Sequence, residues 1–304
     1  MRLFITGISG FVGARLARLA LERGDAVGGV CLGDRPVPEG VDFSPVDVLE
    51  RGALAAAVER FAPDAIVHLA ALSHVGRSWQ AMADYYRVNV LGTEAVLAAA
   101  AGGGRVVVAS SAEVYGAVPA AEQPIGEPRE PAPASPYALT KAAAERLALA
   151  AGAVVVRSFN LLGAGQSAEF ALPSFARQLA AIDRGERPPV LAVGNLTARR
   201  DFLHAADGAA GYRLLAADGV PGEVYNLASG EARSIEQMLE RLMAVAGVEA
   251  RVETDPARLR PVDVPLLAGD AGKLRALGWA PGRGIDDALS ELWCEARGER
   301  EATA

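Results

Sequence analysis

The stretch Ser135-Pro136-Tyr137-Ala138-Leu139-Thr140-Lys141 contains two side chains that together suit proton transfer. Proline is favoured at the first position of a helix and serine just before it, so this stretch predicts the start of a helix capped by Ser135. Tyr137 and Lys141 then lie four residues apart, on one face of that helix. Because a nearby ammonium favours the phenolate, we expect Lys141 to lower the pKa of Tyr137.

Lysine is so rare in this chain that an accidental pair is the less favoured interpretation. Of the 30 Lys and Arg residues only Lys141 and Lys273 are lysine, and the chain has 6 Tyr. Independent placement would give about 0.04 tyrosine–lysine pairs at this spacing. Arginine could not replace Lys141 without changing the chemistry, because its planar head does not give up its proton. The alternative is two unrelated surface residues.

A glycine-rich turn near the N-terminus is typical of a dinucleotide-binding site. Residues 3–6 predict a short buried strand and residues 14–23 an amphipathic helix, with Gly7-Ile8-Ser9-Gly10-Phe11-Val12-Gly13 between them. In this context glycines let backbone N–H groups approach a pyrophosphate at a helix N-terminus. The spacing is G-x-x-G-x-x-G and not G-x-G-x-x-G, so a turn that merely packs the helix on the strand stays the alternative.

Strands and helices alternate along the first 160 residues, which predicts an α/β fold with a Rossmann-like, doubly wound parallel sheet. Further strands are predicted over residues 26–31, 43–48, 65–71, 105–109 and 153–159, and helices over 53–61 and 84–101. We expect residues 1–160 to form a dinucleotide-binding domain to which residues 204–230 return. A smaller C-terminal α/β substrate-binding lobe is expected over residues 161–203 and 231–304.

The end of the second predicted strand bears on the choice between NAD and NADP. An acidic residue at this position binds the adenosine ribose and favours NAD. Here the position is Cys31, and Arg35 follows, whose guanidinium suits a 2′-phosphate. Asp34 lies beside it, so NADP(H) is favoured and NAD(H) is retained as the alternative.

Composition excludes several classes of partner. The chain has 304 residues, 51% hydrophobic and 22% charged, and its net charge of −7 argues against nucleic acid. Two cysteines, Cys31 and Cys294, and three histidines, His68, His74 and His204, show no metal-ligand spacing, so no metal is expected. No signal-peptide pattern or membrane-spanning apolar run is present, which predicts a cytoplasmic protein with no membrane partner.

Taken in order, the motifs resemble the extended short-chain dehydrogenase/reductase family, also called the NAD-dependent epimerase/dehydratase family, over nearly the whole chain. They are the glycine turn, Leu69-Ala70-Ala71, Ser111, Tyr137-x-x-x-Lys141 and Arg157-Ser158-Phe159-Asn160. Further stretches resemble the branch of GDP-4-keto-6-deoxy-D-mannose reductase and GDP-mannose 4,6-dehydratase. These are residues 73–79, 165–167, 193–196 with Arg200-Asp201-Phe202, and Asp255-Pro256-Ala257-Arg258-Leu259-Arg260-Pro261.

The resemblance implies a role for each matching residue. Tyr137 would exchange a proton with the sugar, Lys141 would hold the cofactor ribose, Ser111 would hydrogen-bond the reacting oxygen, and Glu113 is a candidate base. The expected cofactor contacts are Gly7, Gly10, Phe11, Val12, Gly13, Arg35, Asp47, Val48, Leu69, Ala70, Ala71, Asn89, Tyr137 and Lys141. The expected contacts to a nucleotide-diphosphate sugar are Ser73, Val75, Asn160, Arg177, Asn195, Arg200 and Arg260.

Two stretches depart from the family. Leu161-Leu162-Gly163-Ala164 stands where His-x-Gly-Pro is common, and Leu203-His204-Ala205 stands where Thr-Asp-Val is usual. Beside Ser111, the position that carries Asp or Ser in sugar-nucleotide dehydratases is Ala112, which has no proton for a leaving hydroxyl. This residue argues against dehydration.

We therefore expect NADP(H)-dependent reduction of a nucleotide-bound 4-keto-6-deoxyhexose, with conversion of GDP-4-keto-6-deoxy-D-mannose to GDP-D-rhamnose as the favoured reaction. The alternative is a sugar-nucleotide 4-epimerase or 4,6-dehydratase on the same scaffold, and a remote one is a non-catalytic NAD(P)-sensing protein. In this family, helices such as those predicted over 84–101 and 137–151 form a four-helix bundle, which implies a homodimer. Packing of these helices on the sheet alone is the other interpretation.

Overall fold

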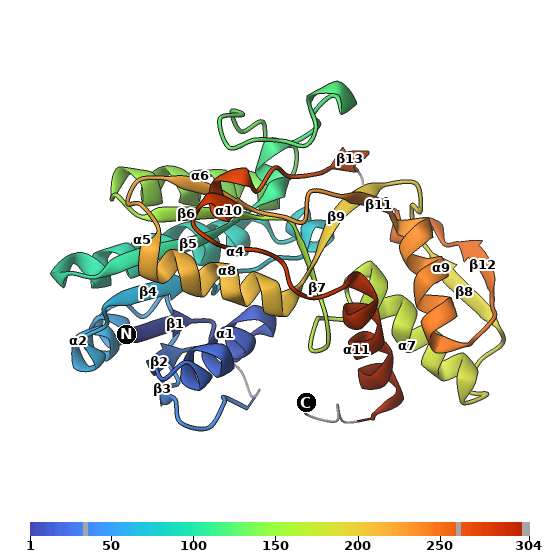
Figure 1. The fold of residues 1–304 in the computed structure, drawn as a ribbon, viewed down its shortest axis with the longest axis horizontal. Helices are drawn as coiled ribbons and strands as arrows, with labels where there is room; N and C mark the ends of the chain where they lie inside the picture. Colours follow the sequence, from blue (N-terminus) through green and yellow to red (C-terminus); the bar gives the residue numbers. More distant parts are fainter. Residues whose placement is uncertain (33–35, 260–262, 300–304) are drawn as a thin grey trace.

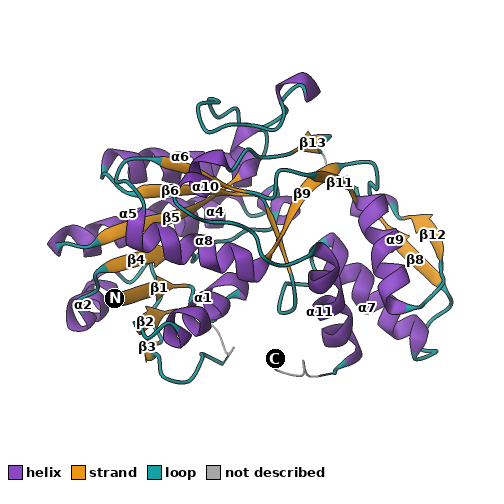
Figure 2. Cartoon of the chain, in the orientation of Figure 1, coloured by secondary structure: helices purple, strands orange, loops and turns teal. Residues whose placement is uncertain are grey.

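The computed structural model describes residues 1–32, 36–259 and 263–299. Its largest element is a seven-stranded sheet with the order β10-β6-β5-β4-β1-β2-β3, and every neighbouring pair is parallel (Figures 1 and 2). The strands are β1 (Arg2–Thr6), β2 (Ala26–Val30), β3 (Asp42–Ser44), β4 (Ala65–His68), β5 (Arg105–Ser111), β6 (Val154–Ser158) and β10 (Val224–Leu227). The order reverses beside β1, as in dinucleotide-binding sheets, which confirms the predicted Rossmann-like fold.

Helices cover both faces of this sheet because successive strand residues point to opposite sides. Leu3 and Ile5 pack in the core beneath α1 (Phe11–Glu22) and α8 (Ala205–Asp218). Phe4, which lies between them in the strand, packs in the opposite core. That core is covered by α2 (Arg51–Phe61), α5 (Gly92–Ala99) and α6 (Pro136–Ala150). Both faces of the inner strands are therefore buried, and these strands are continuous apolar runs in the sequence.

A smaller lobe stands beside the large sheet (Figure 1). It contains a four-stranded sheet of β7 (Asn160–Leu162), β9 (Arg199–His204), β11 (Ala232–Ser234) and β13 (Leu266–Leu267), and a two-stranded sheet of β8 (Val190–Val193) and β12 (Arg251–Thr254). Three helices, α7 (Ala171–Asp183), α9 (Ile235–Ala246) and α11 (Ile285–Arg297), enclose its own apolar core. The shorter helices of the described chain are α3 (Val75–Ser78), α4 (Met82–Tyr85) and α10 (Gly272–Ala276).

Two of the places where the chain passes between the lobes lie side by side. After β6 only Phe159 separates the large sheet from β7, and after β9 the chain enters α8 directly at Ala205. Strands β7 and β9 run parallel, with Asn160 opposite Phe202 and Leu162 opposite His204. This pair of the smaller sheet therefore lies where that sheet meets the large lobe.

Two segments differ from the sequence-based expectations. The helix predicted over 84–101 is divided into α4, a π-helical turn at Tyr86–Leu91, α5 and a 3₁₀ turn at Ala100–Gly102. The π turn contains Asn89, whose buried amide faces the loop after β4, and such turns insert one extra residue into a helix. In addition, residues 264–279 of the predicted substrate lobe pack partly with the core of the large sheet, through Val264, Leu274 and Trp279.

No helix in residues 1–32, 36–259 and 263–299 is long and apolar enough to cross a membrane.

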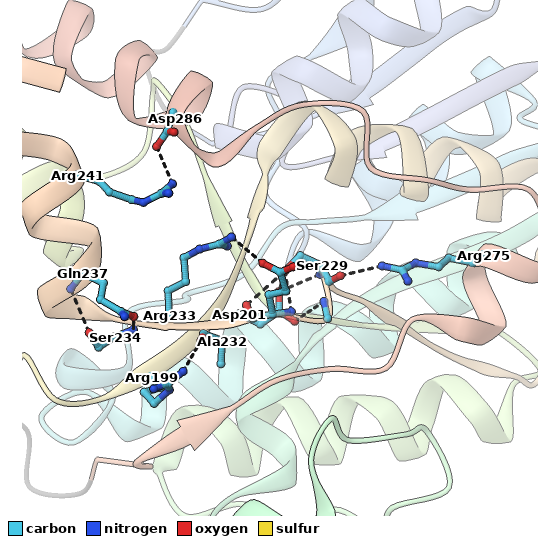
Figure 3. A network of polar contacts seen from close by, with 12 residues as sticks. Arg199, Asp201, Ser229, Ala232, Arg233, Ser234, Gln237, Arg241, Arg275 and Asp286 are labelled. Atoms are coloured by element: carbon cyan, nitrogen blue, oxygen red, sulfur yellow. Dashed lines mark hydrogen bonds and ion pairs between the residues drawn. The ribbon is translucent and has the colours of Figure 1, made fainter. Parts of the chain in front are cut away.

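A buried carboxylate anchors the smaller lobe beside the cleft (Figure 3). Asp201 of β9 is fully buried and accepts hydrogen bonds from the backbone N–H and the hydroxyl of Ser229, at 2.8 and 2.6 Å. Its second oxygen accepts from the N–H groups of Gly230 and Gly269, at 2.9 and 3.2 Å. Burial raises the pKa of Asp201, although these four donors lower it in part. The Arg-Asp-Phe motif therefore contributes structure at this position.

The substitution Asp201→Asn tests this anchor. An amide nitrogen would replace one oxygen and face two N–H donors, so we expect a loss of about 3 kcal/mol in the free energy of unfolding. Urea unfolding followed by circular dichroism measures it. Glu231→Gln, on the exposed neighbouring pair with Arg233, is the matched control and should change stability by less than about 0.5 kcal/mol. Equal effects of the two substitutions would contradict the assignment.

Candidate active site

A cleft of about 900 Å³ runs between the two lobes, from the glycine turn to the loops around residues 194 and 258. Most of the residues expected from the sequence line it. They are Gly7, Gly10, Phe11, Val12, Gly13, Leu69, Ala71, Ser73, Val75, Ser111, Glu113, Tyr137, Lys141, Asn160, Asn195 and Arg200. The structure thus brings together side chains that are far apart in the chain, at the carboxyl ends of parallel strands, where open α/β sheets bind ligands.

Other expected residues do not line this cleft, and they are Asp47, Val48, Ala70, Asn89 and Arg177. The Asp47 carboxylate accepts a hydrogen bond from the Leu49 N–H at 2.9 Å, and Val48 is packed in the core. Arg177 is exposed on α7 and lines a small cavity against α11 that shares Gln166 and Pro173 with the cleft. Arg35 and Arg260 lie outside the described residues.

The glycine turn fits a dinucleotide at close range. Gly7 has a φ of +71°, and a Cβ atom there would lie 2.9 Å from the Ala70 nitrogen. A Cβ on Gly13 would lie 2.2 Å from the Gly7 carbonyl oxygen, so only glycine is accommodated. Helix α1 begins after Gly10 with neither a side-chain cap nor an acidic residue in its first turn. Its N–H groups are therefore available to a pyrophosphate, which is the contact expected of NAD(P).

The helix that carries Tyr137 and Lys141 starts as predicted. The Ser135 hydroxyl accepts a hydrogen bond from the Ala138 N–H at 3.2 Å, and Pro136 occupies the first turn of α6. Both Tyr137 and Lys141 are buried and line the cleft. The ring of Tyr137 packs edge-on against Tyr85, with 6.4 Å between the ring centroids.

The expected lowering of the Tyr137 pKa is wrong for this structure. Burial raises the pKa of the phenol to about 12; a hydrogen bond with Ser111 opposes the rise, whereas the charge of Glu113 adds to it. Burial also lowers the pKa of Lys141 to about 8, against the attraction of Glu145. Desolvation therefore outweighs the neighbouring carboxylate for Lys141, whereas for Tyr137 burial and the charge of Glu113 act in the same direction and favour the protonated phenol.

A second pair of buried charges lies one helical turn beyond Lys141. Glu145 of α6 accepts from Arg157 of β6 at 3.0 Å, and both side chains are nearly inaccessible to solvent. Ser110 also donates to Glu145, and Arg157 lies 4.7 Å from the centroid of the Tyr115 ring. Arg157, part of the Arg-Ser-Phe-Asn motif, is thus a structural partner of α6 and not a ligand contact.

A series of hydrogen bonds between uncharged side chains connects β1, β4 and α6 beneath the cleft. Thr6 and the His68 Nδ1 atom are 2.7 Å apart, and the His68 Nε2 atom lies 3.1 Å from the Thr93 hydroxyl. Thr93 donates to the Asn89 carbonyl, and the Asn89 amide donates to Thr140 at 3.0 Å. Burial, with the charge of Lys141, lowers the pKa of His68 to about 3, so its ring is neutral.

Asn89 therefore acts through the backbone. Its side-chain oxygen accepts from the Leu72 N–H at 2.8 Å, and its amide also donates to the Leu72 carbonyl at 3.0 Å. These bonds hold the end of the Leu69-Ala70-Ala71 segment against α6. The sequence indicated Asn89 as a cofactor contact, whereas the structure places it beneath the loop that lines the cleft.

The far end of the cleft contains a carboxylate that sequence reasoning missed. Asp263 accepts from Arg200 at 2.8 Å and from the Asn195 amide at 2.7 Å. Arg200 also donates to the Val264 carbonyl at 2.6 Å, so its charge is already compensated. Arg258 lines the same end, bonded to Ser174 at 3.1 Å, and it is half exposed. The sequence does show Asp263 directly after residues 258–262, and an acidic residue at that place could have indicated a partner for an arginine.

A comparison with known protein families decides the classification. The family described as GDP-mannose 4,6 dehydratase matches residues 4–292 of the chain. The chain belongs to this family.

Relatives in and around the family share the whole length of the chain. GDP-6-deoxy-D-mannose reductase of Pseudomonas aeruginosa is 36% identical over 96% of this chain and 95% of its own. The structure of RMD from Pseudomonas aeruginosa complexed with NADPH aligns with a TM-score of 0.85 and 34% identity, covering 98% of this chain and 99% of that one. UDP-glucose 4-epimerase of Thermus thermophilus, solved with NAD, aligns at 0.87 and 28%, covering 98% and 99%.

These findings confirm the family predicted from the motifs and the class of enzyme, an NAD(P)-dependent oxidoreductase of the extended short-chain type. They also agree with NADP(H) as the favoured cofactor and NAD(H) as its alternative, because relatives of this GDP-mannose 4,6-dehydratase family and its neighbours bind one or the other. In residues 1–32, 36–259 and 263–299, no three His, Cys, Asp or Glu side chains gather as metal ligands.

The buried ammonium of Lys141 gives a prediction about stability. Its pKa in the folded protein, about 8, is below the ordinary value of 10.5, so the unfolded chain binds more protons between these values and stability rises with pH across that window. Lys141→Met removes the buried charge and keeps the apolar stem. We expect it to raise the free energy of unfolding at pH 7 by up to about 3 kcal/mol.

This gain should shrink as the pH rises through 8 and vanish near 10.5. Urea unfolding at pH 7, 8.5 and 10 measures it. Lys273→Met, at the half-buried lysine paired with the exposed Glu223, is the control, and we expect it to cost about 1 kcal/mol at each pH. A destabilised Lys141→Met protein at pH 7 would contradict the desolvation argument.

Proposed function

We propose that the chain reduces a nucleotide-bound 4-keto-6-deoxyhexose with NADP(H), converting GDP-4-keto-6-deoxy-D-mannose to GDP-D-rhamnose. The observation that carries this proposal is Ala112, which stands between Ser111 and Glu113 in the cleft and offers no proton to a leaving hydroxyl. Reduction of a ketone requires a proton donor beside the hydride donor. Tyr137, which is buried and lines the cleft, is the candidate donor, and it would serve an epimerase or a dehydratase equally well.

The residues of the cleft have distinct roles in the proposed reduction. NADPH, when bound along the glycine turn, supplies the hydride to the ketone carbon. Tyr137 donates its proton to the oxygen as negative charge develops there, and Ser111 hydrogen-bonds the same oxygen. Lys141 holds the cofactor ribose and attracts the resulting phenolate. Glu145 and Arg157 keep α6 in place while these charges change.

The residue beside Ser111 supports reduction over dehydration. Ala112 is 3% exposed and begins the 3₁₀ turn Ala112–Tyr115, so no donor for a leaving hydroxyl stands between Ser111 and Glu113. Leu161, which also lines the cleft, adds an apolar surface. A sugar that already lacks its C6 hydroxyl needs no such donor. The identity of 36% to GDP-6-deoxy-D-mannose reductase supports GDP as the nucleotide.

The diphosphate is proposed to bind at the far end of the cleft. Asn160 and Arg200 were expected there, and both line it. Because Asp263 compensates the charge of Arg200, we assign the free positive charge to Arg258 and a positioning role to Arg200. Arg258 has one exposed acidic neighbour, Asp255 at 3.4 Å, which leaves most of its donors accessible.

One assay tests the proposed reaction. The protein is incubated with GDP-4-keto-6-deoxy-D-mannose and NADPH, and absorbance at the nicotinamide band is followed. Oxidation of NADPH with formation of a GDP-deoxyhexose supports the proposal. Conversion of UDP-glucose without added cofactor would identify a 4-epimerase, conversion of GDP-mannose a dehydratase, and inertness toward all sugar nucleotides a sensor; each of these would overturn it.

Tyr137→Phe tests the proton donor. The substitution removes only the hydroxyl, so we expect kcat to fall by about 10²- to 10⁴-fold. The Kd for NADPH, measured by fluorescence titration, should change by less than about twofold, because the ring and Lys141 remain in place. Turnover near the wild-type rate would contradict the assignment of Tyr137 as proton donor.

A homodimer is proposed through the outer faces of α4, the π turn at Tyr86–Leu91 and α6. Large apolar side chains are exposed there: Met82, Tyr86, Leu91, Leu139 and Leu147. These three segments pack against one another. Large apolar side chains exposed on neighbouring segments are typical of a protein–protein contact surface. We further propose a cytoplasmic location, in keeping with the two free cysteines.

Leu139→Arg tests the dimer, since it places a charge at the centre of the proposed interface. Leu139 is 44% exposed in the single chain, so the fold tolerates the longer side chain. We expect the mass in solution, measured by light scattering, to fall by about half relative to wild type. Val220→Arg, at an exposed residue away from these helices, is the control and should leave the mass unchanged. A monomeric wild-type protein would contradict the assignment.

A further inference from the structure

A carboxylate outside the reaction centre joins three segments that meet where the lobes are connected. Glu291 of α11 lies 2.9 Å from the His204 Nε2 atom and 3.0 Å from an Arg15 guanidinium nitrogen. It also accepts a hydrogen bond from the Ala164 N–H at 3.2 Å. One side chain from the C-terminal helix thus contacts the cofactor helix, the turn after β7, and the junction of β9 with α8.

The charges in this cluster are fixed by their surroundings. Burial alone would raise the pKa of Glu291, but His204, Arg15 and the Ala164 N–H lower it to about 2, so the carboxylate is ionised. The His204 side chain is fully buried, and Arg15 and Glu291 are 17% and 15% exposed. Solvent screens such partly buried pairs much less than it screens surface pairs.

His204 explains one of the departures from the family pattern. Its Nδ1 atom accepts a hydrogen bond from the Ala206 N–H at 3.0 Å, so the imidazole caps α8 as a shorter acceptor would. The Nε2 atom therefore carries the proton and faces Glu291. The histidine in Leu203-His204-Ala205 keeps the cap and adds a second contact that reaches the neighbouring lobe.

Arg15 connects the same carboxylate to the cofactor turn. Its guanidinium donates to the Phe11 carbonyl at 3.2 Å and lies 4.9 Å from the centroid of the Phe11 ring. Phe11 is the first residue of α1 and lines the cleft. Loss of the Glu291 charge would release the Arg15 side chain that holds this residue.

The turn after β7 is shaped around the ion pair. Gly163 has a φ of +153°, and a Cβ there would lie 2.8 Å from the Glu291 Oε2 atom and 3.1 Å from Arg15. Beyond it, Gly165 and Gln166 line the cleft. The backbone conformation of this residue favours glycine in Leu161-Leu162-Gly163-Ala164, and the absence of a Cβ lets the turn lie directly against the two side chains.

We propose that Glu291 is a positioning residue that couples the cofactor turn to the substrate side of the cleft. Through Arg15 it fixes the start of α1, and through Ala164 it fixes the turn that borders the substrate, so NADPH binding and the order of residues 163–165 depend on each other. This inference rests on the proposed use of a nicotinamide dinucleotide, and it is independent of which sugar is reduced.

The experiment compares Glu291→Gln and Glu291→Ala with Asp286→Asn. Asp286 is on the same helix and pairs with Arg241 at 2.9 Å within the small lobe, so its substitution removes a charge without touching the cofactor side (Figure 3). We expect the Kd for NADPH, measured by fluorescence, to rise about tenfold in both Glu291 variants. Asp286→Asn should change the Kd by less than about twofold.

Hydrogen exchange of the peptide that contains residues 163–165 gives a readout besides affinity. NADPH should protect this peptide in the wild-type protein and in Asp286→Asn, and should fail to protect it in Glu291→Ala. Arg15→Gln serves as a second variant should Glu291→Ala not fold. In the double variant Arg15→Gln, Glu291→Gln, the rise in Kd should be no greater than in either single variant, because both remove the same connection.

Three outcomes separate the possibilities. Weaker NADPH binding with lost protection supports the coupling. A lower melting temperature with unchanged Kd and protection would show that Glu291 is only structural, and would overturn the inference while leaving the proposed reaction intact. A wild-type protein that binds neither NADPH nor NADH would overturn the proposed function and the inference together.

Discussion

The structure depends on the pairing of β7 with β9, two strands of the smaller lobe that connect to β6 and α8 of the large lobe with at most one residue between them. They pair in parallel, with Leu161 opposite Leu203. Asn160 and Arg200 reach the cleft because each lies on one of these strands. Both side chains therefore lie where the smaller lobe meets the large one, in the cleft that the carboxyl ends of the large sheet border.

Several charged groups are buried around the cleft, and the neighbours that compensate each charge determine its protonation state. The face of α6 presents Tyr137, Lys141 and Glu145 at successive turns. Glu145 is satisfied by Arg157 and Ser110, so it offsets only part of the cost of burying Lys141. His68, packed near Lys141, is kept neutral, which avoids a second buried cation.

Local rules were sufficient to predict the elements that position the site. The turn from Gly7 to Gly13, the cap at Ser135 and the alternation of strands and helices depend on short-range patterns, and the structure contains all three. Glycine and proline carry this information because their backbone preferences are strong. The order of the strands then follows from the fold class.

Properties that depend on distant contacts could not be predicted in this way. The pKa of Tyr137 was expected to fall, because spacing shows Lys141 but does not show how completely the phenol is buried. The π turn contains Asn89, whose side chain is hydrogen-bonded to Leu72, 17 residues earlier. A contact at this distance does not alter the periodicity of apolar residues, so the sequence pattern could not predict it. Arg177 was assigned by residue type alone, whereas only the packing of α7 on α11 determines which way it faces.

The residues that distinguish the possible reactions on this scaffold lie beside the shared catalytic residues. Reduction, epimerisation and dehydration share the tyrosine, the lysine and the hydroxyl, so these residues cannot distinguish the reactions. Dehydration differs from the other two reactions because a hydroxyl group must leave with a proton, which requires a second acid. Here Ala112 stands beside Ser111 and offers no proton, so the cleft lacks that acid at this position.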